Sequence, residues 1–284
     1  MKLIKEVKHL KDKSEKRAKE IIRIYLNELE KNLSIEVLSV ILVGSLSNSS
    51  YTGNAGSDID LIHILKEDSS NEARNLVKDL IDKVESITNN DLPIAKCIYK
   101  LNDMKRPFPL KFELCLENKD LIELPIEILR IKDSGITIWG RGLIDFIDIP
   151  TRDDIIRSRE LMGMWDKEEK VRFPERYKEN TKYLEGPPSR ILIQSIIVNA
   201  LRDYYFITGK SCSNKKEIGK LMEKNVGNYI FQELLDLCIT FRYTPEEITQ
   251  FQEQWMHEQY KVWRKKRIGK EIGSIEHLVR NQAK

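Results

Sequence analysis

Cysteine is scarce in this sequence and long apolar runs are lacking, and both absences narrow the class of protein. Four cysteines occur in 284 residues, and no two of them form a Cys-x-x-Cys pair. This spacing argues against a zinc site and a disulfide framework, and it favours a reducing cytoplasm. No stretch reaches the ~18 consecutive apolar residues of a membrane helix. The charged start at residues 1–6 also lacks the apolar core of a secretory signal, so we expect a cytoplasmic protein that does not enter a membrane.

A large excess of one charge is also lacking, because 48 Lys and Arg face 45 Asp and Glu. The balance differs along the chain: residues 1–150 carry 23 basic and 25 acidic side chains, whereas residues 151–284 carry 25 and 20. Much of the basic excess lies in residues 261–270, and a segment of this kind can attract nucleic acid. A solvated helix end explains so short a run better, so nucleic acid is an alternative partner and not the favoured one.

The pattern of apolar residues predicts an α/β domain over residues 1–150. Helical spacing predicts helices at 14–33 and 123–132, and a third that begins at a Ser69-x-x-Glu72 capping box and buries a face including Leu76. Short β-branched or alternating runs predict strands, the third and fourth of which form a hairpin. The predicted strands are 35–43, 57–65, 92–101, 110–117 and 136–139.

Strand signals nearly vanish after Pro150, so residues 151–284 are predicted to form an all-α helical bundle. Thr244 precedes Pro245 and has Glu247 three residues on, which is a strong helix start. The most apolar segment follows Ser189 and is expected at the bundle's centre. The predicted helices are 151–165, 189–208, 214–224, 228–241 and 245–266.

One run of residues carries the strongest chemical signal. An apolar strand ends in Val43, the pair Gly44-Ser45 follows, and Asp58 and Asp60 lie in the next apolar strand. Residues two apart on a strand point to the same face, so the two carboxylates are expected side by side. A metal cation is the usual reason to tolerate such a pair. A Gly-Ser turn offers closely approachable backbone N–H groups to a phosphate, so the run predicts a site for a metal-bound polyphosphate.

Gly44-Ser45, a spacer and Ser57-Asp58-Ile59-Asp60-Leu61 together resemble the signature of the polymerase-β-like nucleotidyltransferase superfamily. The resemblance implies an α/β nucleotidyltransferase domain, a mixed sheet with helices, that transfers a nucleotide from a nucleoside triphosphate with Mg²⁺. It implies Asp58 and Asp60 as metal ligands and catalytic residues. It also implies that Gly44, Ser45 and Ser57 bind the nucleotide.

The helical half extends this resemblance. Residues 200–210 and 214–219 are similar to the C-terminal domain of streptomycin- and spectinomycin-type aminoglycoside adenylyltransferases. That similarity implies that Lys216 and Tyr243 contact the triphosphate, with Lys215 as the next candidate for the lysine. A surface lysine in a first helical turn and an aromatic side chain packed on the bundle are the structural alternatives.

The superfamily usually has a third carboxylate, and Glu113 is the candidate for a catalytic base. It interrupts an apolar run on a predicted strand near the aspartate pair, although a solvent-facing residue of an alternating strand fits equally well. Related enzymes often carry this acid on the strand after the helix, but the segment 92–99 has no internal carboxylate and Asp91 only precedes it. His63, by alternation, is expected on the opposite face from Asp60 and is interpreted as a buried or edge histidine and not as a ligand.

The resulting hypothesis is an ATP-binding transferase that moves AMP from ATP to a hydroxyl of a small molecule, such as an aminoglycoside-type antibiotic, and so confers antibiotic resistance. A net basic helical half does not by itself favour a polycationic acceptor. The alternatives are an adenylyltransferase that acts on a protein or an RNA end, and a non-catalytic nucleotide-binding regulatory module.

Overall fold

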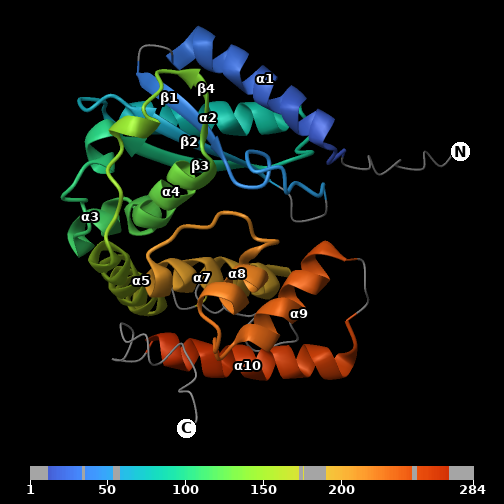
Figure 1. The fold of residues 1–284 in the computed structure, drawn as a ribbon. Helices are drawn as coiled ribbons and strands as arrows, with labels where there is room; N and C mark the ends of the chain where they lie inside the picture. The colour runs from blue at the N-terminus through green and yellow to red at the C-terminus, as the bar shows by residue number, and fades with distance from the viewer. Residues whose placement is uncertain are drawn as a thin grey trace, which may run out of the picture. The chain divides into compact units, whose positions relative to one another are not determined.

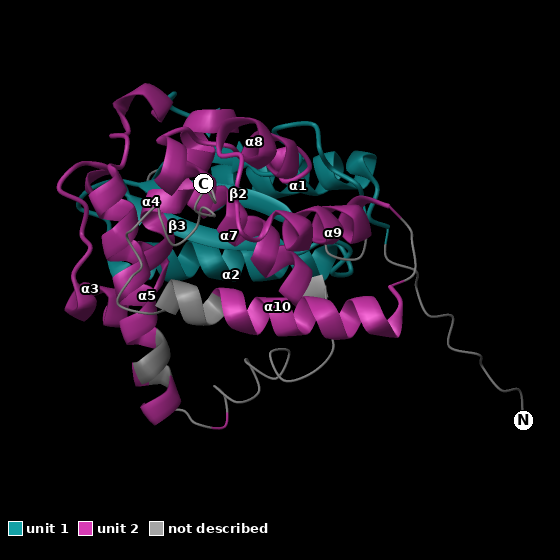
Figure 2. Cartoon of the chain, turned by 60° about the horizontal axis from the view of Figure 1, so that its bottom comes forward, with its two compact units in different colours: residues 1–100, 137–142 teal, residues 101–136, 143–284 magenta. Residues whose placement is uncertain are grey.

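The computed structural model of the chain describes residues 12–33, 36–53, 58–172, 175, 190–244 and 248–268. The chain divides into two compact units, one of residues 1–100 and 137–142 and one of residues 101–136 and 143–284 (Figure 2). The domain boundary at residue 150 that the sequence suggests stays a prediction. No helix among the described residues is both long and apolar enough to cross a membrane.

The first unit is built on a four-stranded mixed sheet in the order β3-β2-β1-β4 (Figure 1). Strand β2 pairs with β1 antiparallel and with β3 parallel. Four of the five predicted strands are confirmed. Their bounds are Val37–Val43 for β1, Ile59–Leu65 for β2, Ile94–Lys100 for β3 and Ile136–Gly140 for β4.

Helices α1 (Glu15–Leu33) and α2 (Asn71–Ile87) pack on one face of this sheet (Figure 1). Their apolar stripes share one core cluster with Ile59 and Leu61 of β2. Since neighbouring residues of a strand point to opposite faces, Asp60 points away from these two helices. The face of β2 that carries Asp60 is therefore not the face that α1 and α2 cover.

The capping box predicted at Ser69 and Glu72 is wrong, and α2 is capped one residue later by a serine alone. The N-cap is Ser70, whose hydroxyl accepts a hydrogen bond from the N–H of Ala73. The hydroxyl of Ser69 donates instead to the carboxylate of Glu36. The expected burial of Leu76 is wrong as well, because this residue is 52% exposed while its neighbours Ala73 and Val77 are buried. The apolar stripe of α2 is narrower than its sequence suggests.

The second unit is helical, and all five helices predicted after Pro150 are confirmed with shifted ends. Buried side chains of α7, α9 and α10, among them Ile197, Leu235 and Trp263, share one core cluster. Within the described residues, the helices of this unit are α3 (Phe112–Glu117), α4 (Asp120–Ser134), α5 (Arg152–Arg172), α7 (Arg190–Thr208), α8 (Ile218–Asn225), α9 (Gln232–Tyr243) and α10 (Gln250–Ile268). Short 3-10 turns lie at Leu101–Met104 and Ile144–Phe146.

Helix α10 begins later than its sequence suggests. Residues 245–247, which carry the predicted start, lie outside the described residues. The described helix begins at Gln250 after Thr249, which forms its own capping box. The N–H of Gln252 donates to the Thr249 hydroxyl at 3.3 Å, and the Gln252 side-chain oxygen accepts from the Thr249 N–H at 2.9 Å.

The predicted strand 110–117, and with it the hairpin, is wrong. Residues 112–117 form helix α3, which starts after Lys111 with its extended backbone (φ −114°, ψ 139°). The apolar residues Phe112, Cys115 and Leu116 satisfy helical i, i+3, i+4 spacing as well as a partial alternation. A six-residue run is too short for periodicity to separate the two structures.

His63 is buried on the α1 side of the sheet, as its alternation predicts, and it is held by two hydrogen bonds. Its Nδ1 lies 3.2 Å from the carbonyl oxygen of Cys97, which can only accept, so Nδ1 carries the proton. Nε2 then accepts from the hydroxyl of Tyr25 at 2.7 Å. Burial lowers the pKa of His63 to about 4. The neutral tautomer is therefore part of the folded core.

This pKa gives a pH dependence of stability with a defined sign. Between the ordinary pKa of 6.5 and the folded value of about 4, the unfolded chain binds a proton at His63 and the folded chain does not. We expect the contribution to the free energy of unfolding to be complete above pH 6.5 and to fall by about 1.4 kcal/mol per pH unit below it. Urea unfolding at pH 7, 6 and 5 measures this loss, which His63→Gln should remove.

Tyr25→Phe is the matched control for that measurement. It removes one hydrogen bond to His63, worth about 1 kcal/mol, yet keeps the titrating ring. Its pH dependence should therefore follow that of the wild-type protein at lower overall stability. An unchanged slope in His63→Gln would contradict the assignment of this pH dependence to His63.

Gly140 closes β4 against β1 at a point where no side chain fits. Its φ is +77°, and an added Cβ would lie 2.2 Å from the carbonyl oxygen of Leu38. We expect Gly140→Ala to lower the free energy of unfolding by about 2 kcal/mol or more, since the strain and the clash add. Gly142→Ala is the control, because a Cβ there meets nothing within 4 Å. Equal urea midpoints for the two variants would refute this account of β4.

Candidate active site

The pairing of β1 with β2 brings the two halves of the sequence motif together. Val43, the last residue of β1, lies opposite Asp60 in the antiparallel register. The chain leaves β1 at Gly44, whose φ of 77° turns it out of the strand. Because the strands run in opposite directions, Gly44 and Ser45 continue past the residues that precede Asp60. The Gly-Ser turn and the aspartate pair therefore lie at the same end of two neighbouring strands.

The segment after Gly44 coils into a hydrogen-bonded turn. The Gly44 carbonyl accepts from the N–H of Asn48 at 3.2 Å and from the hydroxyl of Ser47 at 2.9 Å. The Ser45 carbonyl accepts from the N–H of Ser50 at 3.0 Å. A helical turn presents the N–H groups of its first residues at its start, which is where an anion binds. This geometry suits the phosphate-binding part predicted for Gly44 and Ser45.

Asn48 stabilises this turn and was not recognised from the sequence as a site residue. Its side-chain oxygen accepts from both the N–H and the hydroxyl of Ser50, at 3.1 and 2.6 Å. An Asn that bonds its own backbone two residues on is an Asx turn. The Asn48-x-Ser50 spacing in a small-residue loop is the signal that could have found it.

Asp60 lies on β2, and Asp58 lies one residue before the strand begins. Both side chains are partly exposed. The N–H of Ile59, between them, donates to the carbonyl of Pro93 at 2.9 Å and fixes this end of β2 to the start of β3. Mg²⁺ is commonly held by one or two carboxylates together with substrate phosphates, so this pair fits such an ion.

The neighbouring strand β3 adds no acid to the pair. The parallel register places Ala95 beside Asp60, and the next residue, Lys96, forms an ion pair with Asp82 of α2. Within the described ranges, no group of three or more His, Cys, Asp or Glu side chains is arranged to hold a metal ion. Ser57, the remaining residue of the motif, lies outside the described residues.

The sequence suggested that Glu113 lies on a strand beside the aspartate pair, but the structure does not place it on a strand. It lies in the first turn of α3 in the second unit and is exposed. The positional argument for it as a base is therefore wrong, and its role stays a prediction.

Lys216 and Tyr243 also belong to the second unit. Lys216 is exposed in the turn before α8, where its N–H donates to the side-chain oxygen of Asn214 at 3.0 Å. Tyr243 ends α9, and its ring centroid lies 5.7 Å from the guanidinium carbon of Arg242. Their contacts with a nucleotide stay predictions.

No protein-family model and no curated protein matches the sequence. The comparison with solved structures finds a chain of similar fold over most of the length, which bears on the fold alone. The spectinomycin adenyltransferase AAD(9) from Enterococcus faecialis, crystallised with ATP and spectinomycin, has a TM-score of 0.52 and 17% identity over 86% of this chain and 99% of its own. The resemblance stated from the sequence is thereby confirmed for the fold.

Crystal structures of the MntA-HpeT toxin-antitoxin system are also similar to part of the chain. One, of a point mutant of that system, covers 53% of this chain and 90% of its own, with 17% identity and a TM-score of 0.27. A toxin-antitoxin structure with AMP-PNP covers 54% and 91% at the same identity and TM-score. These values are too low to carry an argument about this chain.

Proposed function

We propose that the protein is a Mg²⁺-dependent nucleotidyltransferase that transfers AMP from ATP to a hydroxyl group of a small molecule. The observation that carries the proposal is the register of β1 and β2, in which the end of β1 lies opposite Asp60. A turn suited to phosphate and a pair of carboxylates suited to a divalent cation then lie at one end of the sheet. A nucleoside triphosphate with its cation presents both of these kinds of group.

The roles of the residues follow from their chemistry. Gly44 and Ser45 would bind the terminal phosphates through backbone N–H groups and the Ser45 hydroxyl. Asp58 and Asp60 would hold Mg²⁺, which supplies neutralising charge on the triphosphate when it is bound. Held in this way, the triphosphate would have its α-phosphate open to attack by the acceptor hydroxyl, with pyrophosphate as the leaving group.

An aminoglycoside-type antibiotic is the proposed acceptor. The support is the fold likeness to a protein crystallised with ATP and spectinomycin, over 86% of this chain. Lys216 and Tyr243 are proposed as further nucleotide contacts from the second unit, by the resemblance of residues 200–219. An acceptor hydroxyl also needs a proton acceptor, and Glu113 is the residue to test for that role.

Pyrophosphate release from ATP with Mg²⁺ tests this function across a panel of aminoglycosides, spectinomycin, lincosamides and RNA. We expect release with one small-molecule class, and a fall in kcat of about 100-fold or more for Asp58→Asn and Asp60→Asn, because the charge that holds the cation is lost. Asp82→Asn is the matched control, since this exposed carboxylate of α2 pairs with Lys96. Its rate should equal that of the wild-type protein.

Each other result has a defined meaning. Wild-type turnover by both aspartate variants rejects the metal site. Tight ATP binding without pyrophosphate release for any acceptor identifies a nucleotide-binding module, and release with RNA alone identifies an RNA-directed enzyme. A Glu113→Gln variant that binds ATP normally but turns over slowly supports a base at Glu113, whereas an unchanged rate removes it.

A further inference from the structure

The loop that begins with the Gly-Ser turn is held again at residues 51–53. The hydroxyl of Tyr51 donates to the carbonyl oxygen of Lys13 at 2.9 Å. Gly53, with a φ of +65°, comes so close that an added Cβ would lie 2.7 Å from the same oxygen. The backbone at Lys13 therefore holds residues 51–53 by contact. Gly44, at the start of the loop, is held because it directly follows β1.

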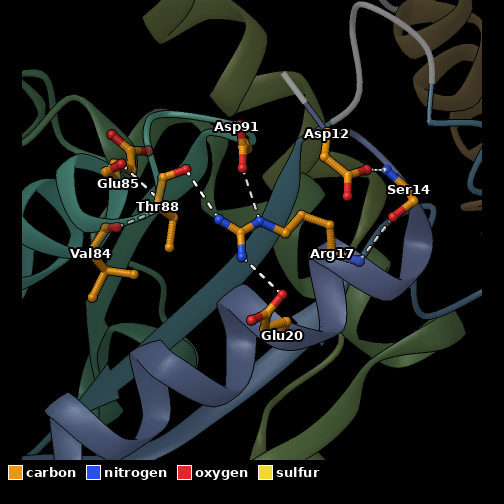
Figure 3. A network of polar contacts seen from close by, with 8 residues as sticks. All are labelled: Asp12, Ser14, Arg17, Glu20, Val84, Glu85, Thr88 and Asp91. Carbon is orange, nitrogen blue, oxygen red and sulfur yellow. Dashed lines mark hydrogen bonds and ion pairs between the residues drawn. The ribbon is translucent and has the colours of Figure 1, made fainter. Parts of the chain in front are cut away.

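Lys13 lies just before helix α1, in a segment held by hydrogen bonds. The N–H of Ser14 donates to the Asp12 carboxylate at 2.9 Å, and the Ser14 hydroxyl accepts from the N–H of Arg17 at 3.1 Å (Figure 3). Ser14 thus caps the first turn of the helix. The carbonyl group of Lys13, which accepts the hydrogen bond of Tyr51, thus lies between Asp12 and Ser14, and these two residues are hydrogen-bonded to each other.

The side chain of Arg17 ties this helix start to the segment that leads into β3. Its Nε donates to the carboxylate of Asp91 at 2.9 Å, and its guanidinium also bonds Glu20 at 2.8 Å and approaches the carbonyl of Thr88 at 3.5 Å (Figure 3). The side chains of Arg17 and Asp91 are 18% and 10% exposed. A shielded, multiply bonded arginine holds its partners more firmly than a surface ion pair does.

Asp91 is two residues before Pro93, whose carbonyl accepts the N–H of Ile59 between the two aspartates. A continuous series of contacts therefore runs from the turn through Tyr51, Lys13 and Arg17 to the aspartate pair. Both halves of the proposed site are fixed to the same helix start. The hydrogen bonds of β1 with β2 close this series into a ring.

We propose that Tyr51 is a positioning residue, which holds the phosphate-binding turn in place relative to the aspartate pair through its bond to Lys13. This inference rests on the proposed function. It predicts that loss of the Tyr51 hydroxyl weakens binding of the triphosphate and not of the nucleoside, because only the triphosphate reaches the turn. A merely structural tyrosine would change stability and leave nucleotide affinity alone.

The test compares Tyr51→Phe with Tyr25→Phe, which removes a tyrosine hydroxyl of the same unit that bonds His63. Affinities for ATP with Mg²⁺ and for adenosine are measured by titration, together with the melting temperature. For Tyr51→Phe we expect ATP affinity to fall about five-fold, the loss of one net hydrogen bond, with adenosine affinity unchanged. For Tyr25→Phe we expect a lower melting temperature and wild-type ATP affinity.

Amide hydrogen exchange without nucleotide gives a second measurement. Residues 44–50 should exchange faster in Tyr51→Phe than in the wild-type protein or in Tyr25→Phe, because the far end of the loop is released. An unchanged rate of amide exchange at residues 44–50 overturns the inference that Tyr51 holds the turn in place. Faster exchange with unchanged ATP affinity reduces Tyr51 to a structural anchor and overturns its positioning role.

The test separates failure of this inference from failure of the proposed function. A wild-type protein that does not bind ATP with Mg²⁺ overturns the proposed function, and the nucleotide role of Tyr51 with it. Wild-type ATP binding together with equal ATP affinity in Tyr51→Phe overturns the positioning role alone.

Discussion

The antiparallel pairing of β1 with β2 is the interaction on which the rest of the site depends. Val43 and Asp60 lie opposite each other only in this register. A slip of one residue would turn Asp60 into the core formed with α1 and α2, and would expose Ile59 or Leu61 in its place. The burial of these two apolar side chains therefore also fixes the face on which the carboxylate lies.

Burial of His63 strengthens the same register from inside the core. Its ring is fully buried opposite Val40 of β1, and both of its nitrogens are satisfied, by Cys97 of β3 and by Tyr25 of α1. A polar group of this kind fits only one arrangement of its neighbours, since an unpaired ring nitrogen in the core would cost about 1–3 kcal/mol. The sheet and α1 are thereby aligned by hydrogen bonds as well as by apolar packing.

The residues that give the helical half its resemblance to adenylyltransferases serve mainly its own core. Asp203 of α7 is fully buried and accepts from Arg159 at 2.9 Å and from the hydroxyl of Tyr229 at 2.8 Å. Tyr204 and Phe206 belong to the apolar cluster of the same unit. The ion pair of the Asp203 carboxylate with Arg159 links α7 to α5. This part of the resemblance is accordingly a signature of the fold.

Local patterns predicted the parts of this protein that local forces determine. The strand before Gly44 and the face of His63 follow from local apolar patterns and alternation, and both appear in the structure as expected, whereas Asp58 lies one residue before β2 and not on the predicted strand. The six residues of α3 could not be assigned, because a run that short satisfies both periods. The hydrogen bond from Tyr51 to Lys13 joins residues 38 positions apart in the sequence, and no sequence pattern in either segment predicts it.

The difference between local patterns and contacts of distant residues also explains why the predicted position of Glu113, the candidate base, was wrong. A base was sought on strands near the aspartate pair, but β3 presents Ala95 beside Asp60, and the next residue, Lys96, pairs with Asp82 of α2. The run that contained Glu113 is helical and belongs to the second unit. A proton acceptor for an attacking hydroxyl must then come from outside β3. Under the proposed function, Gly44, Ser45, Asp58 and Asp60 of the first unit would bind the nucleotide and its cation, and the proton acceptor would be a residue of another element than β3.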